Sequence, residues 1–72
     1  MNRTTERVAK DILAWNEARG RGRLLRKVDI IQYTGSSRDT VDRLTAHLQP
    51  VGGKTTYFYL DVAEALAFSF AD

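Results

Sequence analysis

Residues 27–48, KVDIIQYTGSSRDTVDRLTAHL, contain two short helical patterns separated by a glycine and two serines. Gly35 suits the position just past the first helix, because glycine adopts the left-handed conformation without a steric penalty. Two helices joined by a turn of three to four residues that contains glycine are typical of a helix-turn-helix. We therefore expect helices over about 27–34 and 37–48. Their apolar positions are Val28, Ile30, Ile31 and Tyr33 in the first helix and Val41, Leu44 and Leu48 in the second.

Two serines follow the glycine, and either Ser36 or Ser37 is expected to cap the second helix. Ser36 with Asp39 three residues later has the form of a capping box, with aspartate in place of the usual glutamate. The second helix should end near Leu48, since the residue before Pro50 avoids the helical region.

The N-terminal segment predicts a further helix over roughly 5–19. Val8, Ile12 and Trp15 recur at helical spacing, and Gly20 then ends the pattern.

Residues 19–27, RGRGRLLRK, form a basic stretch with a short apolar centre. Leu24 and Leu25 are expected to return the chain to the core as a very short strand. Although the formal net charge is only +2, five of the eleven basic residues fall in this stretch: Arg19, Arg21, Arg23, Arg26 and Lys27. Such a loop either contacts phosphates, releasing condensed counterions from a duplex, or is a solvated loop without a specific partner.

Residues 50–60, PVGGKTTYFYL, predict a β-hairpin with Val51 in its first strand and a turn at 52–54. Alternation should direct Phe58 and Leu60 into the core and leave the tyrosines nearer the rim. Asp61 is expected to open a final helix over 61–70. Phe68 lies off the apolar stripe of that helix and predicts an exposed patch or a dimer contact.

Length and composition fit one small soluble domain spanning 1–72. A chain of 72 residues buries only about 60% of its unfolded surface, and without cysteine it has no disulfides to compensate. No signal segment or membrane span is evident, so a cytoplasmic location is expected. The order of helix, short strand, helix, helix, hairpin and helix predicts a mostly helical α+β fold. More specifically, it predicts a winged helix-turn-helix with a three-helix core, a hairpin wing and a C-terminal helix.

The segment GSSRDTVDRL resembles the turn and recognition helix of MerR-like excisionases and related small prophage regulators. The later PVGGKTTYFYLDVAEAL resembles their wing and closing helix, and also the DNA-binding domain of phage small terminase subunits. The resemblance covers about residues 25–67. Two positions depart from the pattern: Ser36 replaces a usually buried aliphatic residue after the turn glycine, and Ile31 replaces a usually small residue four places before it.

Together these features predict sequence-specific binding of double-stranded DNA by a small phage or mobile-element regulator, acting in transcription or in recombination. The recognition helix 37–48 would enter the major groove, while the wing 51–60 and the basic loop 19–27 would contact the backbone. Arg38 and Arg43 are the expected base-reading residues, because a guanidinium can donate to guanine O6 and N7 together. The complete expected site is Arg23, Arg26, Lys27, Ser37, Arg38, Thr40, Arg43, Lys54, Thr55 and Thr56.

Other interpretations remain open at this point. Asp39 and Asp42 reduce the charge of the recognition helix, and Arg38–Asp42 and Asp39–Arg43 could be ordinary i, i+4 ion pairs on a solvated face. The fold could then serve as a protein–protein interaction module, or DNA recognition could serve genome packaging. A homodimer or a second protein partner is left open.

Catalysis and metal binding are not expected. His47 is the single histidine and no cysteine accompanies it, so no metal-ligand set is indicated. No catalytic triad or phosphate-binding glycine loop is evident, and no cofactor is expected.

Overall fold

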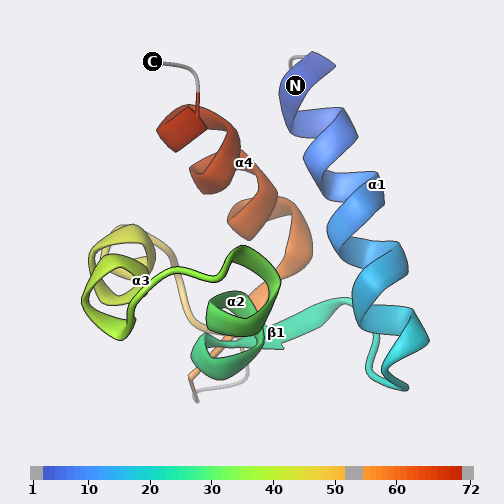
Figure 1. Ribbon diagram of the computed structural model, residues 1–72, viewed down its shortest axis with the longest axis horizontal. Helices are drawn as coiled ribbons and strands as arrows, with labels where there is room; N and C mark the ends of the chain where they lie inside the picture. The colour runs from blue at the N-terminus through green and yellow to red at the C-terminus, as the bar shows by residue number, and fades with distance from the viewer. Residues whose placement is uncertain (1–2, 52–54, 71–72) are drawn as a thin grey trace.

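The computed structural model describes residues 3–51 and 55–70, which form four helices and a two-stranded antiparallel sheet (Figure 1). The fold is therefore mostly helical with a small β component, as the sequence predicts. In chain order the elements are α1 (Arg3–Ala18), β1 (Leu24–Arg26), α2 (Lys27–Thr34), α3 (Arg38–Thr45), β2 (Thr56–Phe58) and α4 (Tyr59–Phe70).

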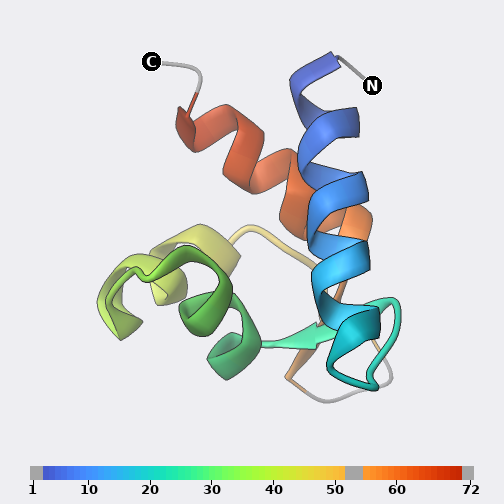
Figure 2. The same cartoon turned by 45° about the vertical axis from the view of Figure 1, so that its right-hand side comes forward.

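The first and last helices, α1 and α4, lie beside each other, while α2 and α3 form the opposite side of the molecule (Figures 1 and 2). Small side chains at Ala9, Ala63 and Ala67 are buried and allow α1 and α4 to approach closely. Every element contributes to one apolar core, which contains Ile12, Leu25, Ile30, Val41, Tyr57, Val62 and Leu66.

The turn between α2 and α3 forms as expected at Gly35 but is capped by a different serine. Gly35 has φ 71°, and its N–H donates to the carbonyl of Ile31 at 2.8 Å. Ser37, rather than Ser36, caps α3, because its hydroxyl accepts the backbone N–H of Thr40 at 3.2 Å. The predicted Ser36–Asp39 capping box is therefore wrong.

The helix α3 is also shorter than the predicted range 37–48. It spans eight residues and ends at Thr45. The backbone N–H groups of Ala46 and Leu48 donate to carbonyls three residues earlier, at 3.3 and 3.0 Å. These bonds are of the 3₁₀ type, so the chain after Thr45 is wound more tightly than an α-helix.

Gly35→Ala should lower the free energy of unfolding by about 1–2 kcal/mol, because a side chain disfavours the left-handed backbone. Apart from the adjacent residues, no atom of the described chain lies within 4 Å of an added Cβ, so the loss would come from the backbone alone. Urea denaturation measures it. Gly22 offers a matched control, since its added Cβ also meets no atom and its φ lies outside the positive range. Equal effects of Gly35→Ala and Gly22→Ala would contradict the explanation.

The sheet contains a strand pairing that was not predicted from the sequence. β1 lies antiparallel to β2 across α2 and α3, with Leu25 opposite Tyr57 and Arg26 opposite Thr56. Val51, expected to begin the hairpin, makes only an isolated bridge with Thr56. The predicted turn 52–54 lies outside the described residues. Thr56 is the partner of both Arg26 and Val51, so β1 lies along the edge of β2 opposite to Val51. Leu25 of β1 is fully buried there.

The prediction of which β2 side chains enter the core is also wrong. Tyr57 is buried with its register partner Leu25, whereas Phe58 and Leu60 are only half-buried. α4 begins at Tyr59, two residues before the predicted Asp61, so the β alternation ends before it reaches Leu60. Asp61 consequently lies in the first helical turn, where its charge suits the positive end of the helix.

Candidate nucleic-acid interface

A buried carboxylate organises the basic stretch that connects α1 to α2. Asp29 has no solvent exposure, and its Oδ2 accepts the backbone N–H of Arg26 at 2.9 Å. Three guanidinium groups surround it: Arg19 Nη1 at 3.1 Å, Arg21 Nε at 3.8 Å and Arg26 Nε at 3.6 Å. One negative charge therefore faces three positive ones, and this part of the chain remains cationic.

The surroundings of Asp29 determine its ionisation. Burial alone would raise its pKa, because it disfavours the charged form. The hydrogen bond from the Arg26 backbone and the charges of Arg21, Arg26 and Arg19 outweigh burial and lower the pKa below its ordinary value. Asp29 is thus held as a carboxylate.

Two further contacts hold the loop before β1 in place. Asn16 is fully buried on α1, and its side-chain amide donates to the carbonyls of Gly22 at 2.7 Å and Leu24 at 3.1 Å. The guanidinium of Arg19 lies 4.4 Å from the ring centroid of Trp15, within range of a cation–π interaction. The stretch 19–27 is therefore an ordered part of the surface rather than a free solvated loop.

An ion pair connects the two helices of the turn. Lys27 Nζ on α2 lies 3.0 Å from Asp42 Oδ1 on α3. This contact gives Asp42 a structural role and reduces the free charge of Lys27. The alternative left open by the sequence, i, i+4 ion pairs Arg38–Asp42 and Asp39–Arg43, does not occur among the described ion pairs.

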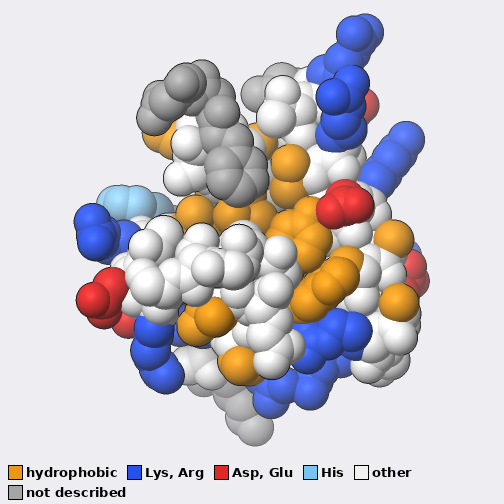
Figure 3. Space-filling view, in the orientation of Figure 1, with side chains coloured by type: hydrophobic (Ala, Val, Ile, Leu, Met, Phe, Trp, Pro, Cys, Tyr) orange, Lys and Arg blue, Asp and Glu red, His pale blue; other side chains and the backbone are white. Residues whose placement is uncertain are grey.

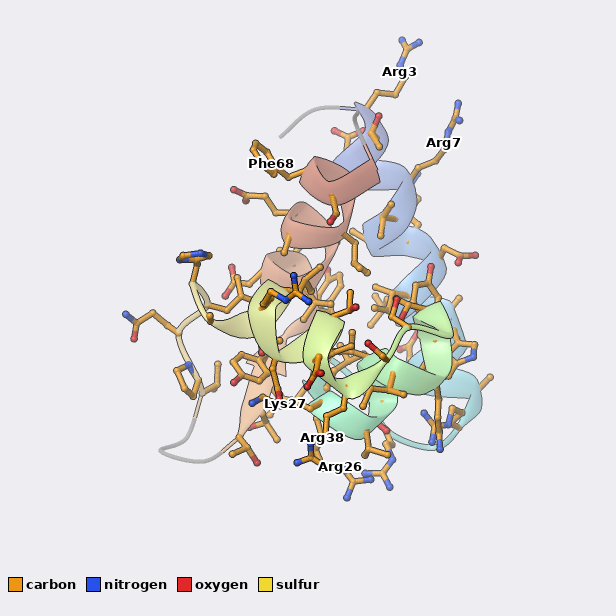
Figure 4. The ribbon with its side chains drawn as sticks, turned by 60° about the vertical axis from the view of Figure 1, so that its left-hand side comes forward. Arg3, Arg7, Arg26, Lys27, Arg38 and Phe68 are labelled. Atoms are coloured by element: carbon orange, nitrogen blue, oxygen red, sulfur yellow. The ribbon has the colours of Figure 1, made fainter. Side chains whose placement is uncertain are left out.

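Arg38 lies next to the Lys27 contact and makes no ion pair with any described residue. Positions four apart lie on the same helix face, so Arg38 neighbours Asp42, which in turn binds Lys27. Figure 4 shows Arg38, Lys27 and Arg26 at the same side of the molecule. In Figure 3, Lys and Arg side chains gather over the end of the molecule where β1 and α2 lie. We call Arg26, Lys27 and Arg38 the basic face.

The structure brings together part of the predicted site. Thr56 lies opposite Arg26 in the sheet and thus beside the basic face, and exposed Thr55 precedes it. Arg23 is at the far end of β1, where its carbonyl accepts the N–H of Tyr59 at 2.8 Å. Lys54 lies outside the described residues.

The other predicted residues at and after the start of α3 do not join the basic face. Ser37 and Thr40 hydroxyls lie 3.0 Å apart and are engaged in capping the helix. Arg43 lines a groove between α3 and α4. It lies five residues after Arg38, which puts it on a different face of α3. The sequence did not indicate a role for Asp29 or Asn16, nor the contacts that they make. The signal for Asp29 was an acidic residue in the first turn of a helix that follows a run of arginines.

Comparison with protein families, curated proteins and solved structures finds no match for this chain. Among the described residues, no group of three or more histidine, cysteine, aspartate or glutamate side chains is placed to hold a metal ion. No helix in the described ranges is long and apolar enough to cross a membrane.

Proposed function

We propose that this protein is a winged helix-turn-helix protein that binds double-stranded DNA sequence-specifically, as a small phage or mobile-element type regulator. The observation that carries the proposal is the basic face: an exposed Arg38, without an ion-pair partner in the part of the chain that the structure describes, opens α3 directly after a glycine turn, beside Arg26 and Lys27 (Figure 4). In this proposal α3 is the recognition helix, and the β1–β2 sheet with the segment before β2 is the wing.

The dimensions of α3 suit the major groove. An α-helix with its side chains is about 10–12 Å across, and the major groove of B-form DNA is about 12 Å wide, so α3 fits within it. Recognition helices contact base edges with residues near their N-terminus. Arg38 is the first residue of α3, which supports the proposal that its guanidinium donates to guanine O6 and N7.

The neighbouring cations would bind the phosphate backbone. Arg26 and Arg23 lie on β1 or just before it, and Lys27 can exchange its Asp42 carboxylate for a phosphate at similar distance. Asp39 is exposed in the first turn of α3 without an ion-pair partner among the described residues. Its charge repels phosphates, so it would weaken binding to unrelated duplexes and raise the share of affinity that depends on base sequence.

Arg38→Ala should weaken binding to a preferred duplex by about 5- to 150-fold, which corresponds to the loss of about 1–3 kcal/mol for one base contact. Binding to a scrambled duplex should change much less. Fluorescence anisotropy with both duplexes measures the two affinities. Arg7→Ala is the matched control, because it removes the same charge from the distant end of α1 (Figure 4). Equal losses in the two variants, or equal losses on both duplexes, would argue against base reading by Arg38.

A further inference from the structure

A groove of about 570 Å³ lies between α3 with its following turn and α4. Its apolar lining comes from Leu44, Leu48 and Ala65, and Phe68 stands beside them. Phe68 is 83% exposed, the highest value among the exposed large apolar side chains described. A phenylalanine so exposed next to an apolar groove indicates a surface that another molecule covers.

The two edges of this groove carry opposite charges. Arg43 lies on the α3 edge, whereas Asp61 and Glu64 lie on the α4 edge. None of these three side chains forms an ion pair within the described part of the chain. Each edge therefore has charge available for a partner of opposite sign.

We infer that a second copy of this chain covers the groove across a two-fold axis. Two-fold pairing brings the same patch of both copies together, so the patch must be complementary to itself. This groove is complementary to itself both in shape and in charge. Each copy supplies both the Phe68 side chain and the apolar groove to receive it, and each supplies a positive and a negative edge, so that Arg43 of one copy can face Glu64 of the other.

The pairing should be weak. Its apolar centre consists of a few side chains, whereas stable interfaces bury about 800 Å² on each partner. We therefore expect a dimer that forms as concentration rises through the micromolar range. The groove lies on a different side of α3 from the basic face, so the inference does not depend on DNA binding.

Sedimentation equilibrium of the full chain from about 5 to 500 μM would measure the association. The wild type should shift from monomer to dimer over this range, and Phe68→Glu should weaken association at least tenfold by placing a charge against the apolar groove. Leu24→Glu is a control, because it adds the same charge at another exposed apolar residue, on β1. Circular dichroism would show whether each variant is folded.

Charge reversal gives a sharper test that does not depend on one substitution. Arg43→Glu and Glu64→Arg should each weaken the dimer, since each places like charges across the interface. The double variant should restore association, because it exchanges the two edges. A wild type that stays monomeric, or a double variant that associates no better than the single variants, would overturn the inference. Phe68→Glu should still bind duplex DNA non-specifically, so failure here is distinguishable from failure of the proposed function.

Discussion

Asp29→Ala should lower the free energy of unfolding by about 1–3 kcal/mol, because the backbone N–H of Arg26 loses its acceptor and three partly exposed arginines lose their shared carboxylate. The variant leaves Arg19, Arg21 and Arg26 close together without the carboxylate that they share. It also removes the acceptor for the backbone N–H of Arg26, which precedes α2. A domain of this size has only about 4–11 kcal/mol in total. Urea denaturation measures the change.

Asp39→Ala is the matched control for this prediction. Asp39 is exposed and has no ion-pair partner among the described residues, so its loss should change the stability by less than about 0.5 kcal/mol. Acid titration adds a second check. Because the folded-state pKa of Asp29 is lowered, its contribution is complete above about pH 4, the ordinary pKa, and is lost as the pH falls through the lower folded value. Comparable stabilities of Asp29→Ala and Asp39→Ala would contradict this account of the basic stretch.

Raising the salt concentration from 50 to 200 mM should weaken duplex binding by about 40- to 150-fold. This range follows from three to four phosphate contacts, each contributing about 0.9 to the slope of log affinity against log salt. Candidates for these contacts are Arg23, Arg26 and Lys27, with Lys54, which lies outside the described residues, as the fourth that the sequence predicts.

Arg26→Ala should reduce that slope by about one and weaken all duplexes alike, since a phosphate contact carries no base information. Anisotropy titrations at four salt concentrations measure the slope, with Arg7→Ala as the charge-matched control. A wild-type slope near zero would place the binding surface elsewhere, and a slope equally reduced by Arg7→Ala would show that only net charge matters.

Local signals in the sequence predict the helices well. The bounds of α2 agree with the predicted 27–34, because Gly35 ends the helix through a local backbone requirement. The start of α3 follows from its serine cap in the same way, although the choice between two adjacent serines depends on which hydroxyl reaches Thr40. These features depend on residues within one or two helical turns of each other.

The sheet and the buried ionic cluster depend on distant residues and could not be predicted in this way. Pairing of Leu25 with Tyr57 joins segments separated by both central helices, and the local hairpin pattern around Val51 gives no sign of this second partner of β2. The same pairing buries Tyr57 and turns Phe58 outward. Asp29 looks like an ordinary acidic residue of a first helical turn until Arg19 and Arg21 are brought to it across the loop.

This placement changes the interpretation of the basic residues. The sequence suggests a free cationic loop beside a nearly neutral helix, whereas the structure ties Arg19 and Arg21 to Asp29 and Lys27 to Asp42. Arg38, at the start of α3, has no ion-pair partner in the described ranges, and it becomes the main candidate for contact with bases.

Selection of bound duplexes from a random library, with the wild type and Arg38→Ala in parallel, tests the central claim most directly. The wild type should enrich a short motif that contains a preferred guanine. Arg38→Ala should enrich the same motif without preference at that base pair, because only the contact made by this side chain is lost. No enrichment by the folded wild type, or identical motifs from both proteins, would contradict sequence reading by the first turn of α3.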